Sequence, residues 1–149
     1  MKHIKSIVKI VCLTLCVMSI LTVAVPADAA TVTVRNSLDK RLSLAFYYTD
    51  NTGGDVTQGW WYVGPGGKTT VTLDADDSKP VYYAAFNKEL YSDSSTVKDA
   101  QVRGVLSYKK FTYGADVEPS DAEVFESKFF KCPENGVVNI NADSRGKQL

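Results

Sequence analysis

The sequence predicts an all-β domain, built as an antiparallel β-sandwich or a barrel-like sheet with at most one short helix. Three observations lead to this prediction. Short segments rich in β-branched and aromatic residues recur along the chain, turn-forming clusters of Gly, Pro, Asn and Asp separate them, and no helical period is sustained beyond residue 30. We expect about seven or eight short strands from this pattern.

The first half of the domain contains five expected strands. Each is either alternating in polarity or rich in β-branched residues, and each is bounded by a turn cluster. The second strand has an apolar face, which we expect to lie in the core. This face consists of Leu42, Leu44, Phe46 and Tyr48. In chain order the five strands are 31–35, 41–49, 56–63, 69–73 and 81–86.

The pattern weakens in the second half of the chain. The polar stretch 90–100 is expected to be a loop, and 102–113 is expected to hold one or two strands. The segments 129–132 and 137–140 flank a turn cluster at 133–136, which predicts a final hairpin.

Two further features lie near the end of the chain. Ser120 and Glu123 have the spacing of a capping box, which predicts one or two turns of helix at this point. The tail 143–149 is polar, and we expect it to fray.

Residues 1–29 have the pattern of a secretory signal peptide. Three lysines precede an uncharged run over 10–25, and Ala27 and Ala29 then supply a small-residue cleavage site. Sixteen residues of helix span about 24 Å, which is short of a bilayer core. We therefore expect a single exported domain, 30–149, in the periplasm or outside the cell, with no membrane span after cleavage.

Composition excludes several functional classes. The 17 basic and 17 acidic residues balance, so the chain lacks the positive charge that nucleic-acid binding requires. His3 is the only histidine and lies in the signal, which removes imidazole-dependent catalysis and histidine-ligated zinc. Cys12 and Cys16 also lie there, so Cys132 has no partner for an intramolecular disulfide and is expected to be a buried thiol.

Acidic residues suggest two kinds of site. The run 74–77 contains three aspartates, but it lacks the other ligand positions of an EF-hand loop, and a solvated turn accounts for it. The pairs Glu118 with Asp121 and Glu123 with Glu126 would suit a glycosidase only if they faced one another across a cleft. We expect no metal and no cofactor.

Aromatic doublets are the most distinctive feature of the chain. They occur at 47–48, 60–61, 82–83 and 129–130. Adjacent strand residues point to opposite faces, so each doublet turns one ring outward if the sheet has an open face. Such rings suit the binding of sugars, peptides or a protein. The alternative is that both faces are covered. The candidate binding residues are Tyr47, Trp60, Tyr62 and Tyr82.

Residues 59–66, GWWYVGPG, resemble the signature of the bacterial family known as domain of unknown function 1036. The resemblance covers about 31–87 and includes Asn36 in the first turn. Arg35 and Lys68 stand where members of that family often have cysteines, so this chain resembles a divergent member. The resemblance implies a β-fold and an exported setting, and it implies no activity, ligand or catalytic residue.

Strand alternation and this resemblance together assign the two tryptophans. Trp60 shares a face with Gln58 and Tyr62, and the family tends to have a polar residue at the position of Tyr62. We therefore expect Trp60 on the exposed surface and Trp61 in the core.

The sequence favours a non-enzymatic exported module of the cell envelope that binds an envelope protein or a glycan through exposed aromatic residues. One alternative is a histidine-free hydrolase that uses two carboxylates on envelope polysaccharide. Another is a structural subunit that assembles with itself as a homo-oligomer through its aromatic face.

Overall fold

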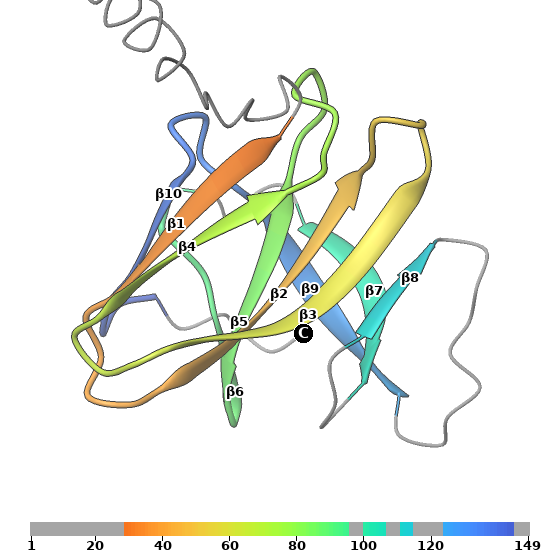
Figure 1. Cartoon of the computed structure of the whole chain (residues 1–149). Coiled ribbons are helices and arrows are strands. Elements are labelled where there is room, and N and C mark those ends of the chain that lie inside the picture. Colours follow the sequence, from red (N-terminus) through yellow and green to blue (C-terminus); the bar gives the residue numbers. More distant parts are fainter. Residues whose placement is uncertain (1–28, 96–99, 107–110, 115–123, 145–149) are drawn as a thin grey trace, which may run out of the picture.

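The computed structural model describes residues 29–95, 100–106, 111–114 and 124–144. Within these ranges the chain forms ten strands in two sheets and no helix, which confirms the predicted all-β class (Figure 1). The strands are β1 (Ala30–Asn36), β2 (Leu42–Thr49), β3 (Asp55–Val63), β4 (Lys68–Leu73), β5 (Tyr82–Asn87), β6 (Glu89–Tyr91), β7 (Ala100–Leu106), β8 (Phe111–Gly114), β9 (Val124–Lys131) and β10 (Val137–Ile140).

The smaller sheet has the strand order β10-β1-β4, and the larger one has the order β7-β9-β5-β2-β3-β8, with β6 also paired to β5. The larger sheet curls into a half-barrel beside the smaller one (Figure 1). Its pairs are all antiparallel, as expected. In the smaller sheet β1 pairs antiparallel with β4 but parallel with β10.

The main core fills the space between the two sheets. The predicted apolar face of β2 lies in it, because Leu42, Leu44, Phe46 and Tyr48 are all buried. Burial of a side chain of this size contributes about 1.5–3 kcal/mol, so this face alone is a large part of the driving force for folding. The buried members of the main core are Val32, Val34, Leu42, Leu44, Phe46, Tyr48, Val63, Val71, Leu73, Ala75, Tyr83, Ala85, Tyr91, Phe130, Val138 and Ile140.

A second core lies on the concave side of the half-barrel. It covers the opposite face of β2 and β5, so these two central strands are buried on both sides. The expectation of an open aromatic face on these strands is therefore wrong, and the alternative of two covered faces is correct here. The buried members of this half-barrel core are Ala45, Tyr47, Trp60, Ala84, Val105, Phe111 and Phe129.

The predicted final hairpin is wrong. A turn does form, because Gly136 N–H donates to the Pro133 carbonyl at 2.9 Å. However, β9 pairs with β5 and β7 in the half-barrel, whereas β10 crosses to the smaller sheet and pairs with β1. Crossing allows Val138 and Ile140 to bury their side chains in the main core.

The stretch expected to be a loop begins with a strand. Glu89–Tyr91 forms β6, which turns back on β5 through Lys88, whose φ is 58°. Residues 1–28 of the signal-like segment, the capping-box residues Ser120 and Glu123 and the tail from residue 145 lie outside the described residues. Across the part of the chain that is described, no helix has the length and apolar character needed to cross a membrane.

Candidate functional site

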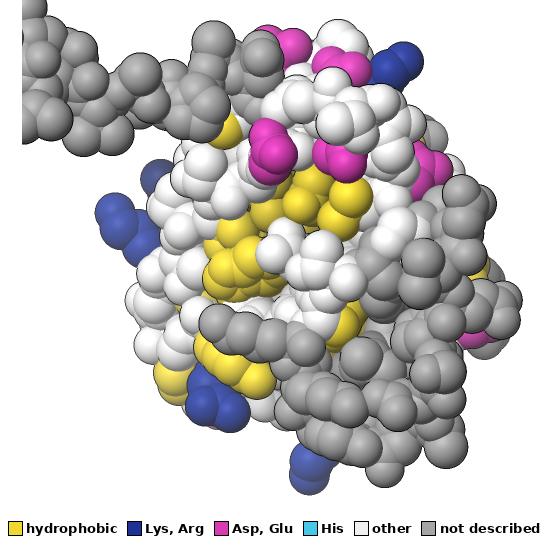
Figure 2. Space-filling view, turned by 45° about the vertical axis from the view of Figure 1, so that its right-hand side comes forward, with side chains coloured by type: hydrophobic (Ala, Val, Ile, Leu, Met, Phe, Trp, Pro, Cys, Tyr) yellow, Lys and Arg dark blue, Asp and Glu magenta, His cyan; other side chains and the backbone are white. Residues whose placement is uncertain are grey.

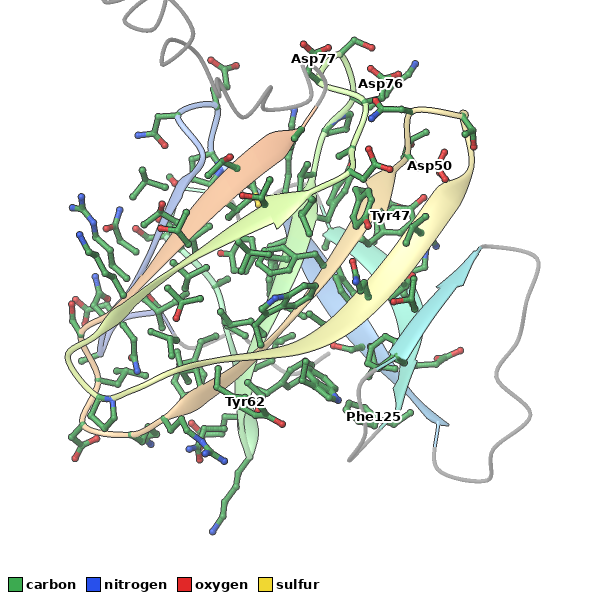
Figure 3. All side chains as sticks on the ribbon, viewed as in Figure 1. Tyr47, Asp50, Tyr62, Asp76, Asp77 and Phe125 are labelled. Carbon is green, nitrogen blue, oxygen red and sulfur yellow. The ribbon has the colours of Figure 1, made fainter. Side chains whose placement is uncertain are left out.

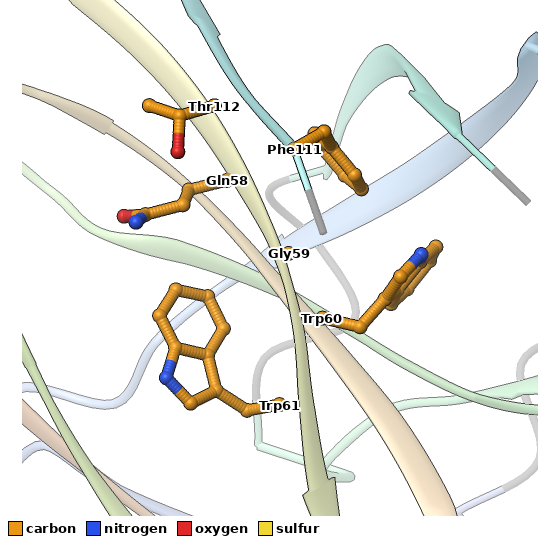
Figure 4. A pocket seen from close by; sticks show the side chains of 6 residues that line it. All are labelled: Gln58, Gly59, Trp60, Trp61, Phe111 and Thr112. Carbon is orange, nitrogen blue, oxygen red and sulfur yellow. The ribbon is translucent and has the colours of Figure 1, made fainter. Parts of the chain in front are cut away.

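A β-bulge reverses the side-chain alternation of β3 at Trp60. Ala45 of β2 lies opposite Gly59, but Leu44 lies opposite Trp61, so Trp60 is an extra residue in its strand. An inserted residue shifts every later side chain to the other face. Gln58 and Trp61 consequently project from one side of β3, and Trp60 projects from the other (Figure 4).

The prediction that Trp60 lies on the exposed surface is wrong. Its indole is only 5% exposed and packs edge-on against Phe86 and Phe111, with both ring centroids 5.6 Å away. Trp61 is half-buried and contacts Phe46 at a centroid distance of 5.3 Å. The residue expected at the surface is thus in the half-barrel core, and the residue expected in the core is the more accessible one.

A pocket of about 380 Å³ opens beside the bulge (Figure 4). It lies where β8 stops pairing with β3, since Phe111 pairs with Gly59 and β3 continues beyond it. None of its lining side chains is ionisable, so it offers no acid or base. The lining residues are Gln58, Gly59, Trp60, Trp61, Phe111 and Thr112.

Tyr47 and Tyr82 form a separate pair at the other end of the half-barrel (Figure 3). Their ring centroids are 5.6 Å apart, and the guanidinium of Arg103 lies 4.0 Å above the Tyr47 ring. Tyr47 is 9% exposed. Burial raises its pKa, while a hydrogen bond with Arg103 lowers the pKa and the Asp55 carboxylate raises it. Tyr47 shares the half-barrel core with Trp60, and Tyr82 packs against that core, but neither tyrosine lines a pocket with Tyr62.

The candidate site is a groove of about 400 Å³ at the end of the half-barrel where Tyr62 and Phe125 lie (Figure 3). Its residues come from β2, β3, β5, β6 and β9, and we call it the aromatic groove. The lining residues are Ser43, Trp60, Tyr62, Phe86, Lys88, Glu89, Leu90, Phe125, Glu126, Ser127 and Lys128.

Aromatic rings form a continuous surface in this groove. Phe86 contacts both Trp60 and Phe125, at centroid distances of 5.6 and 5.8 Å. Tyr62 is 49% exposed and Phe125 is 40% exposed, while Arg41 lies 4.7 Å from the centroid of the Tyr62 ring. The cation holds Tyr62 in place from one side, so the groove presents two large, accessible rings above a buried aromatic floor.

The groove exists because β6 separates β9 from β5. On one edge of β5, Tyr82 and Tyr83 pair with β9, but Ala85 and Phe86 pair with β6. One strand edge accommodates one neighbour at a time, so β9 leaves β5 where β6 begins. The half-barrel therefore opens at this end, below its core.

Charged side chains of both signs border the aromatic surface. Lys88 and Lys128 supply ammonium groups, and Glu89 and Glu126 supply carboxylates. Glu89 accepts a hydrogen bond of 3.1 Å from the Tyr91 hydroxyl. The border therefore offers both hydrogen-bond donors and acceptors, with no excess of either charge.

The acidic run 74–77 follows β4, forms an isolated bridge between Ala75 and Asp50, and enters a turn at Asp77. Asp74 accepts a hydrogen bond of 2.7 Å from the Asn51 side chain, and Asp76 accepts two from Ser78, which lower the pKa of Asp76. Figure 2 shows acidic side chains gathered at one end of an apolar surface area. Among the described residues, no group of three or more acidic, cysteine or histidine side chains is arranged to hold a metal ion.

Of the carboxylates proposed for catalysis, only Glu126 lies within the described residues, and it borders the groove. Glu118, Asp121 and Glu123 lie outside them. Sequence reasoning missed Phe86 and Phe125. Phe125, Ser127 and Phe129 occupy every second position of β9 and so share one face. This period of two would have extended the predicted strand from Phe129 back to Phe125.

Comparison with known proteins adds no relative, since no protein-family profile, curated protein or solved structure matches the chain. The resemblance of residues 59–66 to the family of unknown function stays a prediction.

Proposed function

We propose that this chain is an exported, non-enzymatic binding module of the bacterial cell envelope, and that it holds its ligand in the aromatic groove. One observation carries the proposal. Among the described residues three large hydrophobic side chains are exposed, and two of them, Tyr62 and Phe125, line the same groove. Exposed apolar groups that gather in one concave place are typical of binding sites.

The composition of the groove supports binding over catalysis. Trp60 and Phe86 form a floor, while tyrosine, lysine, glutamate and serine side chains surround it. Ligand sites in proteins commonly combine an apolar surface with a few polar groups that fix orientation. The export part of the proposal is supported by the signal-like pattern of residues 1–29.

The test uses the mature chain, residues 30–149, with a glycan array and a displayed library of random decapeptides as probes. We expect binders in at least one set, and we expect Tyr62→Ser and Phe125→Ser each to weaken binding by about tenfold or more. Val102→Ser is the matched control, because Val102 is also exposed and apolar but does not line the groove. Its binding should be unchanged.

Two outcomes would contradict the proposal. Binding that survives both groove substitutions would place the ligand elsewhere, and an absence of binders in both sets would remove the proposed role. Light scattering tests the alternative that the chain assembles with itself. A dimer of the mature chain that dissociates on Tyr62→Ser would identify the groove as a self-assembly surface.

A hydrolase is the second candidate, because Glu89 and Glu126 border the same groove. Retaining and inverting glycosidases need two carboxyl groups about 5–9 Å apart. The hydrolase predicts release of reducing ends from purified envelope polysaccharide, with turnover lost in Glu89→Gln and Glu126→Gln. If the chain is a binding module, the unaltered chain should release no reducing ends from the polysaccharide.

A further inference from the structure

The aromatic groove runs along the edge of a strand rather than over a sheet face. Four consecutive residues of β9, 125–128, all line it. Neighbouring residues on a strand point to opposite faces, so a hollow above one face would be lined by alternate residues only. Contact with four in a row means that the groove passes around the edge of β9.

This edge of β9 has no neighbouring strand among the described residues. β7 pairs with the other edge of β9 from Val124 to Phe130. β5 reaches the groove-side edge only at Phe130 and Lys131. In an antiparallel pair, alternate residues turn their N–H and C=O groups away from the partner. Alternate residues of 125–128 therefore direct backbone donors and acceptors into the groove.

Backbone groups of this kind need hydrogen-bond partners when a ligand displaces water from them. An extended polypeptide supplies them at the right spacing, because its own N–H and C=O groups alternate in the same way. A sugar chain can stack on Tyr62 and Phe125, but it has no regular series of amides to match a strand edge.

We propose that the aromatic groove binds an extended peptide segment of a partner protein, which adds to the edge of β9 as a further strand. The inference rests on the proposed binding role of the groove and names the class of its ligand. The added strand turns alternate side chains toward Trp60 and Phe86, so apolar residues are required at alternate positions of the peptide.

The charged side chains around the groove further restrict the composition of the peptide. Lys88 and Lys128 are balanced by Glu89 and Glu126 around the groove, which disfavours strongly basic or strongly acidic segments. Charged residues at a strand edge also hinder indiscriminate pairing. The preferred peptide therefore alternates apolar residues with polar ones and carries charges of both signs.

Decapeptides selected from the random library provide the probe for this inference. Bound peptide should slow amide hydrogen exchange by about tenfold or more at alternate residues within 125–128, as followed by nuclear magnetic resonance of the mature chain. Each peptide is then made in two N-methylated forms, one for each set of alternate amides. Only one set faces β9, so one form should lose binding and the other should keep it.

Tyr62→Ser and Phe125→Ser should weaken peptide binding, and Val102→Ser should leave it unchanged. Groove-dependent binding of glycans without any peptide binder would overturn the strand-addition inference and preserve the proposed function. Peptide binding that tolerates both methylated forms, or that leaves exchange at 125–128 unaltered, would also overturn it. An absence of both peptide and glycan binders would overturn the two proposals together.

Discussion

The side-chain amide of Asn36 donates a hydrogen bond of 2.9 Å to the carbonyl oxygen of Gly64. The same amide donates to the Lys40 carbonyl at 2.7 Å, and its oxygen accepts from Leu38 N–H at 3.0 Å. Asn36 is only 1% exposed, so these partners stand in for water. One buried side chain thus joins the turn after β1 to the turn after β3.

Asn36→Ala should therefore destabilise the protein by about 2–3 kcal/mol, because it leaves buried backbone groups without hydrogen bonds. Urea unfolding of the mature chain measures the loss. Asn135→Ala is the control, since Asn135 is exposed and accepts one hydrogen bond from Val137 N–H at 3.0 Å. Its loss should be about 1 kcal/mol or less. Equal losses in the two variants would contradict the structural role given to Asn36.

The two tryptophans should differ in the order of their burial, since Trp60 is buried and Trp61 is half-buried. Trp60→Ala removes a buried indole between Phe86 and Phe111 and should cost about 3–5 kcal/mol. Trp61→Ala removes a half-buried side chain and should cost about 1–2 kcal/mol. Acrylamide should quench Trp61 fluorescence more strongly than that of Trp60, each measured with the other residue changed to Phe. The opposite order in both measurements would contradict the burial of Trp60 in the half-barrel core.

The tryptophan assignment shows which structural information lies in local sequence and which does not. Alternation predicts the burial of Leu42, Leu44 and Phe46 correctly, because β2 is regular along that face. In β3 the same rule fails at Trp60, because the bulge is determined by pairing with Ala45 on another strand. No pattern within residues 55–63 indicates the bulge.

Long-range pairing limited the prediction of the groove in the same way. Tyr62 was predicted as a binding residue from alternation within its own strand together with the resemblance of residues 59–66. Phe125 comes close to Phe86 because β9 pairs with β5 at Tyr82 and Tyr83, although the two strands are far apart in the sequence. The pairing of β10 with β1 likewise cannot be predicted from local sequence, because the two strands lie at opposite ends of the domain in the sequence. Such contacts depend on topology rather than on residue spacing.

Gly59 should tolerate no side chain. A Cβ atom there would lie 2.9 Å from Phe111 Cε1 and 3.2 Å from Ala45 Cβ, inside the half-barrel core. Gly59→Ala should therefore cost about 1–3 kcal/mol through overpacking. Gly64→Ala is the matched control, because a Cβ at Gly64 meets nothing within 4 Å. Thermal unfolding should show a clear loss for Gly59→Ala and nearly none for Gly64→Ala; similar melting temperatures would contradict the packing at the bulge.

Asp93 should make stability depend on acidic pH. Burial is the largest single influence and raises the pKa of this carboxyl, but hydrogen bonds from Ser95 and Asn139 together hold the pKa below its usual value. A pKa lower in the folded than in the unfolded state gives stability that is complete above the unfolded value. This stability is lost as the pH falls through the folded value.

Urea midpoints between about pH 6 and pH 2 test this dependence on Asp93. The midpoint should fall with the pH, and Asp93→Asn should lower it at pH 6 and make the fall shallower. Asp143→Asn, which changes an exposed carboxyl near the end of the described chain, should leave the urea midpoint at pH 6 unchanged. An Asp93→Asn profile parallel to that of the unaltered chain would show that Asp93 does not contribute to the pH dependence.

Cys132 should react slowly in the folded protein. Its side chain is half-buried against the main core, so its expected burial is met in part, and desolvation raises the pKa of the thiol to about 12. The thiolate is the reactive form, so at pH 8 almost no reactive species is present in the native state. Ellman's reagent should label the folded chain more than about a hundredfold more slowly than the chain unfolded in urea.

Native labelling of Cys132 should accelerate steadily as the pH is raised from 8 toward 10, because the thiolate fraction grows tenfold with each pH unit below the pKa. Fast native labelling at pH 8 would mean that the thiol is accessible, and a dimer that reducing agent dissociates would mean that two chains pair through it.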